Sequence, residues 1–261
     1  MSPTLSVLRK EIAASGDPER AKFVAGYFKT GKGEYGEGDK FLGIATPRLR
    51  QLARRGRGMS LVDLLKLLHS PWHEERSVAL LMMVDAHDRA AGAEQRAIHR
   101  AYLANAKYVN NWDLVDTSAP ELVGPYIGKD ETRLLERLAK SKLLWERRIA
   151  MVATHHATRR GDLVPALVIA ERLLDDEHDL MHKAVGWMLR EVGKRSPDTL
   201  RAFLTEHAAT MPRTALRYSI ERFTPEERKR WMNVRAESAN ATVSSATASP
   251  PRSHRPAKKR R

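Results

Sequence analysis

A tryptophan and an aspartate stand four residues apart in the segment NNWDLVD, residues 110–116. Residues with this spacing share one face of a helix, so Trp112 and Asp116 should point in the same direction. A carboxylate beside an aromatic face is suited to stabilising positive charge that develops during a reaction. Together the two residues are candidates for half of a catalytic site.

The same segment also contains residues typical of a helix start. Asn110 or Asn111 can cap the helix, and Asp113 then falls in its first turn, where a negative charge suits the helix dipole. Helix-start chemistry explains Asn111 and Asp113. It does not explain Asp116, which lies beyond the first turn and is either a functional or a structural carboxylate.

An arginine interrupts the apolar face of the segment SKLLWERRIAMVATHH, residues 141–156. On a helical wheel at about 100° per residue, Arg148 falls among the apolar positions, whereas Arg147 falls outside them. An arginine there is costly unless it is paired, snorkels or faces a cleft. Two interpretations stay open: a buried pair with a carboxylate, and a cleft-facing guanidinium that binds a phosphate or carboxylate.

A second tryptophan lies in the basic segment DLMHKAVGWMLREVGKR, residues 179–195. Trp187 falls at the edge of the apolar arc, beside Lys183 and Arg190 and one turn before Lys194. A protein that stacks an aromatic ring on a base and also contacts phosphates needs an aromatic residue beside basic residues, as here. A tryptophan at an interface or rim, packed beside lysine stems, is the alternative.

Sequence evidence for a metal site or a nucleophile is weak. His178 and His182 have the i, i+4 spacing of a metal site but lack an HExxH context, so we interpret them, like His155 and His156, as solvated helical histidines. The chain has no GxSxG nucleophile elbow and no cysteine, which excludes thiolate metal sites and a cysteine nucleophile. We expect neither a metal nor a cofactor.

Helices must position these residues, because nearly everything before residue 236 carries apolar residues at i, i+3, i+4 spacing. Prolines stand just inside the expected helix starts, and no alternating segment predicts a strand. We therefore expect an all-α fold of stacked helical hairpins, an α-solenoid of degenerate repeats, with a compact irregular bundle as the alternative. The expected helices cover residues 3–14, 18–30, 46–55, 60–69, 72–85, 94–105, 112–124, 129–140, 143–159, 162–174, 178–193, 197–209, 211–221 and 224–232.

One loop departs from the short connections found elsewhere. The segment KTGKGEYGEGDKFLG, residues 29–43, contains glycines at 31, 33, 36, 38 and 43. It lacks the GxxxxGK[ST] pattern of a phosphate-binding loop. It is either a flexible connection after the first helical pair or a mobile loop that lies along a ligand.

The net charge of +14 and the pI of about 10.2 indicate a polyanionic partner. Residues 236–261 carry six Lys or Arg and one Glu, which leaves 40 basic and 31 acidic residues, or +9, on residues 1–235. Such an excess attracts nucleic acid or an anionic membrane, and a generally solubilising surface is the alternative. We expect one domain over 1–235 and a disordered basic tail over 236–261 that adds phosphate contacts.

The assembled segments resemble the AlkD family of alkylpurine DNA glycosylases. The resemblance covers roughly residues 5–232. Four segments in order are more specific than any single one. They are YFKTGKGEYGEGDKFLGIATPRLRQLAR (27–54), NNWDLVD (110–116), WERRIAM (145–151) and HKAVGWMLREVGKR (182–195).

The resemblance implies a concave, basic solenoid of HEAT-like repeats that holds duplex DNA. It also implies excision of cationic alkylated purines, N3-methyladenine and N7-methylguanine, which leaves an abasic site. The resemblance further implies an enzyme that clamps the nucleotide from its backbone side, without conventional base flipping. Because no tight pocket would then surround the base, bulkier adducts would also be accepted. We expect Lys183, Arg190, Lys194 and Arg147 to contact the DNA.

The resemblance also assigns roles to single residues. In the family's WDxxD motif the catalytic carboxylate falls on Asp116 and not on Asp113. The other implied site residues are Trp112 and Trp187, against the sugar of the damaged nucleotide, the supporting Arg148, and the N-terminal aromatic Tyr27.

Two other classes of protein stay open. One is a non-catalytic solenoid that binds damaged or branched DNA, against which the presence of Asp116 with both tryptophans argues. The other is a protein-interaction solenoid, against which the basic charge argues. No lysine stands out as a Schiff-base nucleophile, and no apolar run approaches the roughly 20 residues of a membrane span. We therefore expect a monofunctional, monomeric enzyme of the cytoplasm that associates with the nucleoid through DNA.

Overall fold

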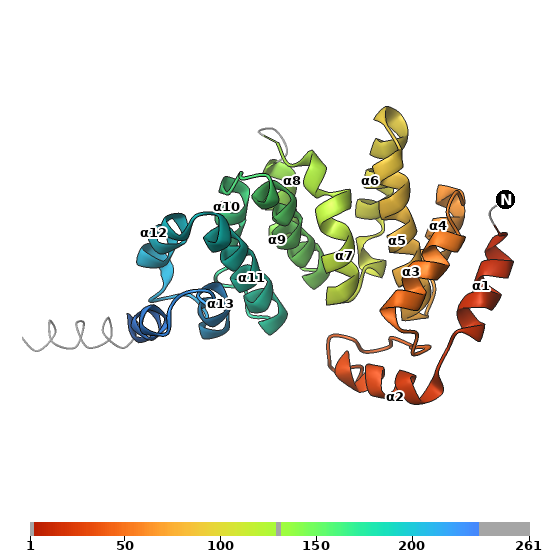
Figure 1. Cartoon of the computed structure of the whole chain (residues 1–261), viewed down its shortest axis with the longest axis horizontal. Coiled ribbons are helices and arrows are strands. Elements are labelled where there is room, and N and C mark those ends of the chain that lie inside the picture. Colours follow the sequence, from red (N-terminus) through yellow and green to blue (C-terminus); the bar gives the residue numbers. More distant parts are fainter. Residues whose placement is uncertain (1–2, 129–131, 235–261) are drawn as a thin grey trace, which may run out of the picture.

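The computed structural model describes residues 3–128 and 132–234, and its helices form a curved row (Figure 1). Within these residues there is no β-strand, only one parallel β-bridge between Lys40 and Trp72. The expected all-α fold is confirmed. The helices are α1 (Leu5–Ala14), α2 (Pro18–Tyr27), α3 (Thr46–Arg55), α4 (Leu61–Leu68), α5 (His73–Arg89), α6 (Gly92–Ala104), the 3-10 helix η1 (Ala106–Tyr108), α7 (Trp112–Leu122), the 3-10 helix η2 (Gly124–Tyr126), α8 (Thr132–Ala139), α9 (Leu144–Arg159), α10 (Val164–Arg172), α11 (Asp179–Arg195), α12 (Pro197–His207) and α13 (Arg213–Ser219), followed by helical residues 225–234.

Consecutive odd-numbered helices pack against one another in the order α3, α5, α7, α9, α11 and α13. The even-numbered helices α4, α6, α8, α10 and α12 pack on this inner row and form a second layer. A continuous core of buried aliphatic side chains lies between the layers. This arrangement is that of a helical-repeat solenoid, in which each pair of helices buries its apolar face against its neighbours.

Close packing within the inner row depends on a glycine in α11. A Cβ atom on Gly186 would stand 2.5 Å from the carbonyl oxygen of Ala215 in α13. Only a residue without a side chain allows the two backbones to approach this closely. Gly186 directly precedes Trp187, so this close contact lies next to a residue of the candidate site.

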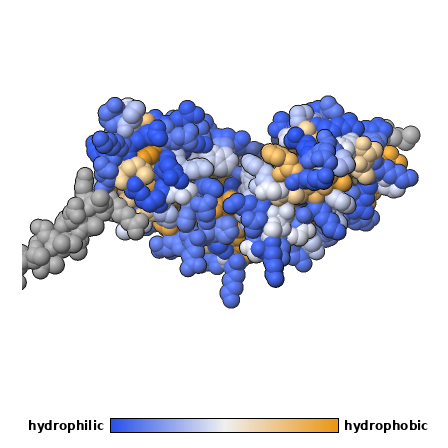
Figure 2. Space-filling model, turned by 90° about the horizontal axis from the view of Figure 1, so that it is seen from below, coloured by the Kyte–Doolittle hydropathy of each residue, from blue (hydrophilic) through white to orange (hydrophobic). Residues whose placement is uncertain are grey.

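Helix α2 stands apart from the row of helices (Figure 1). None of its residues is buried, and Phe23 and Tyr27 are 73% and 59% exposed. Figure 2 shows the molecule from below, the side on which α2 lies. Hydrophilic residues cover most of this side, which is hollowed between the N-terminal and C-terminal halves.

Two helices end more than two residues away from the sequence-based expectation. The helix expected over residues 18–30 ends at Tyr27, because Lys29 has a φ of 51°, in the left-handed region that ends a helix. Helix α5 continues past the expected end at residue 85 to Arg89, whose guanidinium pairs with Asp85 one turn earlier at 2.8 Å.

Some expectations lie outside the described residues. These are the tail over 236–261 and the start of the helix expected over 129–140. Among the residues that the structure does describe, no helix is both long enough and apolar enough to cross a membrane.

Candidate functional site

A cleft of about 510 Å³ opens between α2, the glycine-rich loop, α7, α9, α11 and α13. Most residues singled out from the sequence line this cleft, although they come from helices far apart in the chain. Arg147 and Lys194 are not among its lining residues. The lining residues are Tyr27, Lys29, Tyr35, Trp112, Asp116, Arg148, His178, Asp179, Leu180, Lys183, Trp187, Arg190 and Tyr218.

Asp116 and Arg148 form a two-pronged ion pair at the bottom of the cleft. The Arg148 Nε and Nη2 atoms donate to the two carboxylate oxygens of Asp116, both at 2.9 Å. The third nitrogen, Nη1, donates to the backbone carbonyl of Leu180 at 2.6 Å. Arg148 is 4% exposed, so the helical-wheel prediction that it lies among apolar residues is confirmed. The first interpretation of Arg148, a buried pair with a carboxylate, is confirmed, and binding of a ligand by its guanidinium stays a prediction.

The ion pair controls the charge of the Asp116 carboxylate. Burial raises the pKa of Asp116 above its usual range, and the nearby guanidinium of Arg148 opposes that rise. The bonds from Arg148 favour the ionised form and fix the orientation of both oxygens. Arg148 thus supports the form of Asp116 that can stabilise a cation.

Aromatic rings form the wall of the cleft beside Asp116. The Trp112 ring stacks on Phe28 with centroids 5.2 Å apart, and Tyr27 contacts it edge-on at 6.1 Å. Phe28 in turn stacks on Phe41, which stacks on His73. The end of α2 is therefore joined to α7 and α5 through a continuous aromatic cluster.

Trp187 forms another part of the wall and has a polar partner of its own. Its indole Nε1 donates to a carboxylate oxygen of Glu191 at 3.2 Å. The ammonium group of Lys194 binds both oxygens of the same carboxylate at 2.7 and 2.9 Å. Lys194 is therefore engaged in orienting the partner of Trp187, and its contact with DNA stays a prediction.

The basic residues proposed to contact DNA differ in their surroundings. Arg147 binds the carboxylate of Asp176 at 2.6 Å and the backbone carbonyls of residues 141 and 142, so its guanidinium is committed to the protein. Lys183 pairs with Asp179 at 2.7 Å, and its side chain is 41% exposed at the cleft. Arg190 also lines the cleft and pairs with Glu221. Lys183 and Arg190 are thus better placed for a ligand than Arg147.

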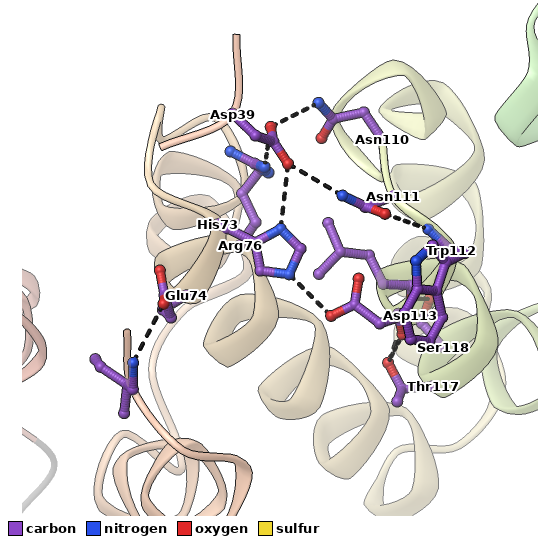
Figure 3. Close-up of polar contacts among 12 residues, drawn as sticks. Asp39, His73, Glu74, Arg76, Asn110, Asn111, Trp112, Asp113, Thr117 and Ser118 are labelled. Carbon is purple, nitrogen blue, oxygen red and sulfur yellow. Dashed lines mark hydrogen bonds and ion pairs between the residues drawn. The ribbon is translucent and has the colours of Figure 1, made fainter. Parts of the chain in front are cut away.

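The start of α7 is capped as the sequence predicted, since the side-chain oxygen of Asn111 accepts from the backbone N–H of Trp112 at 2.9 Å. Asp113 does more than favour the helix dipole, because it accepts from Nε2 of His73 at 2.8 Å (Figure 3). Nδ1 of His73 lies 3.2 Å from a carboxylate oxygen of Asp39. Burial alone would lower the pKa of His73, but the two carboxylates raise it to about 9, so the imidazolium form is stable at neutral pH.

The interpretation of His178 and His182 as solvated helical histidines is wrong. His178 caps α11, and its Nδ1 accepts from the backbone N–H of Leu180 at 3.1 Å. His182 contacts the carbonyl oxygen of Asp176 at 2.5 Å. Both rings thus bind backbone groups around the start of α11. Across residues 3–128 and 132–234, no cluster of three or more His, Cys, Asp or Glu side chains has the arrangement of a metal site.

Sequence reasoning missed two residues of the cleft that belong to the glycine-rich loop. Lys29 and Tyr35 both line the cleft. The available signal was the loop itself, whose glycine content indicates a segment that could lie along a ligand. Because Lys29 and Tyr35 line the cleft, the expectation that this loop lies along a ligand stays a prediction.

The sequence of this chain matches a known protein family. The family model described as DNA alkylation repair enzyme matches residues 8–223, and the chain belongs to that family. The expected relationship to AlkD-type proteins is therefore confirmed. Membership makes the protein a DNA alkylation repair enzyme, with DNA as its substrate.

The fold has a counterpart among solved structures. A predicted DNA alkylation repair enzyme from Enterococcus faecalis matches with a TM-score of 0.63 at 18% sequence identity, covering 81% of this chain and 98% of that chain. At this identity the likeness shows the fold alone. No curated protein matches the chain closely enough to serve as a relative.

Proposed function

We propose that this protein is a monofunctional DNA glycosylase that excises cationic alkylated purines from duplex DNA and leaves an abasic site. N3-methyladenine and N7-methylguanine are the proposed substrates. The observation that carries the proposal is the Asp116 carboxylate, held by Arg148 at a cleft whose walls include Trp112 and Trp187.

The chemistry follows from the charge of the lesion. Alkylation at N3 or N7 makes the purine cationic, so the base departs with the electron pair of the glycosidic bond and needs no general acid. The deoxyribose is left with oxocarbenium character, and the ionised carboxylate of Asp116 stabilises it by Coulomb attraction. Water then adds to C1′ and loses a proton, which leaves the abasic sugar and the free base.

The two tryptophans favour the same cationic intermediate. An aromatic face stabilises a nearby cation by about 0.5–2 kcal/mol. Trp112 and Trp187 lie on α7 and α11, on either side of α9, which carries Arg148. We infer that the enzyme grips the sugar and backbone of the damaged nucleotide between these walls, without conventional base flipping.

Binding of the duplex depends on charge. Lys29, Lys183 and Arg190 line the cleft, and residues 1–235 carry a net charge of +9. Cations at the cleft would contact phosphates on either side of the lesion, while the remaining excess attracts DNA at longer range. A monomer is sufficient for this arrangement, because a single chain supplies every proposed site residue.

Analysis of the reaction products tests the proposal. Duplex DNA treated with a methylating agent should release free methylated purines on incubation with the protein, and the strands should stay intact until alkali cleaves the new abasic sites. Tight binding to the alkylated duplex without release of any base would contradict the proposal and indicate a non-catalytic DNA binder. Strand cleavage without alkali would contradict monofunctional chemistry.

A further inference from the structure

Helix α2 exposes two large aromatic side chains one turn apart, Phe23 at 73% and Tyr27 at 59%. We propose that Phe23 and Gly26 form a contact surface for the sugar–phosphate backbone of DNA beside the lesion, which extends the wall of the cleft along α2. This inference rests on the proposed function only for the position of the damaged nucleotide, which lies in the cleft.

The amphipathic pattern of α2 sets the direction of Phe23. Ala21, Val24 and Ala25 are partly buried and lie on one side of the helix, toward the body of the protein. Phe23 falls on the opposite side, about 40° from Tyr27 on a helical wheel, since residues four apart share a face. Because Tyr27 lines the cleft, the exposed side of α2 continues the wall of the cleft.

Gly26 lies beside the two rings, and neither the backbone nor the packing of α2 requires a glycine there. Its φ is not positive, and a Cβ atom added to it would meet nothing within 4 Å in the described part of the chain. Glycine in a helix is less favourable than alanine, so this residue lowers stability without serving a turn or a packed contact. A glycine does allow close approach of a ligand to the backbone. The open space beside Phe23 and Tyr27 suits such a ligand.

Helix α2 is held at both ends, although none of its residues is buried. At its start the backbone N–H of Asp17 donates to the carbonyl oxygen of Leu42 at 2.8 Å, and a Cβ atom on Gly43 would stand 2.2 Å from the carbonyl oxygen of Asp17. At its end Phe28 stacks on Trp112, with ring centroids 5.2 Å apart. The contact surface is therefore presented in a fixed position, which reduces the entropy lost on binding.

The chemistry of the contact surface fits DNA better than a protein partner. Two exposed rings are too few for a stable protein interface, which buries about 1,200–2,000 Å². An aromatic face suits the C–H groups of deoxyribose, and the exposed Arg20, three residues before Phe23, can contact a phosphate. Sugar and phosphate contacts of this kind read no base, so they agree with a grip from the backbone side.

Helical geometry gives the position of the contacted sugar. At about 1.5 Å per residue, Phe23 lies about 6 Å from Tyr27 along α2. The nucleotides of one strand advance by about 3.4 Å along the duplex. We therefore expect Phe23 to contact a sugar one or two nucleotides from the lesion.

Gly26→Ala distinguishes a contact surface from an idle one. The added methyl group meets no protein atom and alanine favours a helix, so the denaturant midpoint of unfolding should rise. The same methyl group obstructs the contact surface, so the dissociation constant for DNA should rise by about threefold. The probe is a duplex with one tetrahydrofuran abasic analogue, which fixes the register without being a substrate. An idle surface would give the gain in stability with unchanged binding.

Phe23→Ala tests the ring itself. Loss of apolar contact area should raise the dissociation constant for the same duplex by about fivefold. The midpoint of unfolding should change little because the ring is exposed, and the slope of log affinity against log salt should stay the same because the ring carries no charge. Val164→Ala is the control, because Val164 is 63% exposed on α10 and does not line the cleft.

Hydroxyl-radical footprinting of the same complexes locates the contact. Wild type should protect sugars one or two nucleotides from the abasic analogue, and Phe23→Ala should lose this protection while Val164→Ala retains it. Wild-type dissociation constants for both Phe23→Ala and Gly26→Ala would overturn the inference. If wild type released no methylated purine but these changes in binding and protection were observed, the proposed function would fail and the contact surface on α2 would stand.

Discussion

Asp113 and Asp116 lie three residues apart on α7, and a neighbouring helix of the inner row supplies a cation to each. Asp113 accepts a single bond from His73 of α5, and its other carboxylate oxygen is buried without a hydrogen-bond partner. Asp116 accepts two bonds from Arg148 of α9 and lines the cleft. Two carboxylates on one helix therefore serve different purposes, and their environment decides which one can take part in chemistry.

The side of α7 that faces His73 has a structural role. Asp113, His73 and Asp39 connect α7, α5 and the glycine-rich loop through buried or half-buried groups. The Arg148 side belongs to the proposed site, where Asp116 lines the same cleft as the two tryptophans. Substitutions on the first side should alter stability, and substitutions on the second side should alter excision.

The largest effect is expected for Arg148→Ala. Without the guanidinium the Asp116 carboxylate is left buried and unpaired, so the free energy of unfolding should fall by about 3–5 kcal/mol. The pKa of Asp116 should rise further, which moves the acid limb of the excision rate to higher pH, since only the ionised carboxylate is active. Chemical denaturation and a pH–rate profile of Arg148→Ala measure the two effects, and Arg148→Lys, which retains a charge, should change both by less. An acid limb of Arg148→Ala at the wild-type position would contradict the role given to the pair.

A smaller effect, on stability alone, is expected for His73→Gln. The folded protein holds a proton on His73 up to a pKa of about 9, above the unfolded value of 6.5. The stability that this group contributes is therefore complete below pH 6.5 and is lost as pH rises toward 9. Unfolding free energies of wild type should fall across this window, and those of His73→Gln should fall less. Equal slopes would show that His73 does not carry the proton.

A still smaller effect is expected for Glu191→Gln. This substitution weakens the acceptor that orients the Trp187 indole and removes the charge that binds Lys194. We expect the excision rate to fall several-fold while the free energy of unfolding changes little. Glu206→Gln is the matched control, because Glu206 is an exposed carboxylate on α12. Equal excision rates for the two variants would show that Glu191 does not position Trp187.

The smallest effect distinguishes two lysines of α11. Lys183→Ala should weaken binding to duplex DNA and reduce the slope of log affinity against log salt by about one. Lys194→Ala should leave that slope nearly unchanged, because its ammonium group is bound to Glu191. Titrations at several salt concentrations compare the two variants. A larger change in slope for Lys194→Ala would reverse the assignment.

The inner row of helices could be predicted from sequence because its signals are local. Asn111 as a cap, prolines at helix starts and apolar spacing all act within a few residues. Arg148 was found in the same way, since its position among apolar residues requires only helical geometry. These local signals marked Asp116, Arg148 and both tryptophans as candidates, and the resemblance to the AlkD family assigned them to a common site.

The glycine-rich loop could not be predicted, because its conformation depends on distant partners. Asp39 binds Asn110, which is 71 residues away in the chain, and the loop backbone binds Glu74. No periodic pattern links such residues, so Tyr35 was not recognised as part of the cleft. The sequence also contained an unused signal, since Glu191 and Lys194 are three residues apart on one helix and could have been expected to pair.

Comparing Asp116→Asn with Asp113→Asn tests the central claim most directly. Each variant removes one negative charge from the same helix with little change in shape. With alkylated duplex DNA at saturating enzyme, Asp116→Asn should release methylated purine at least ~10²-fold more slowly than wild type while still binding the duplex. Asp113→Asn, measured at a temperature where it is folded, should release it at close to the wild-type rate. Release by Asp116→Asn at the wild-type rate would contradict the account.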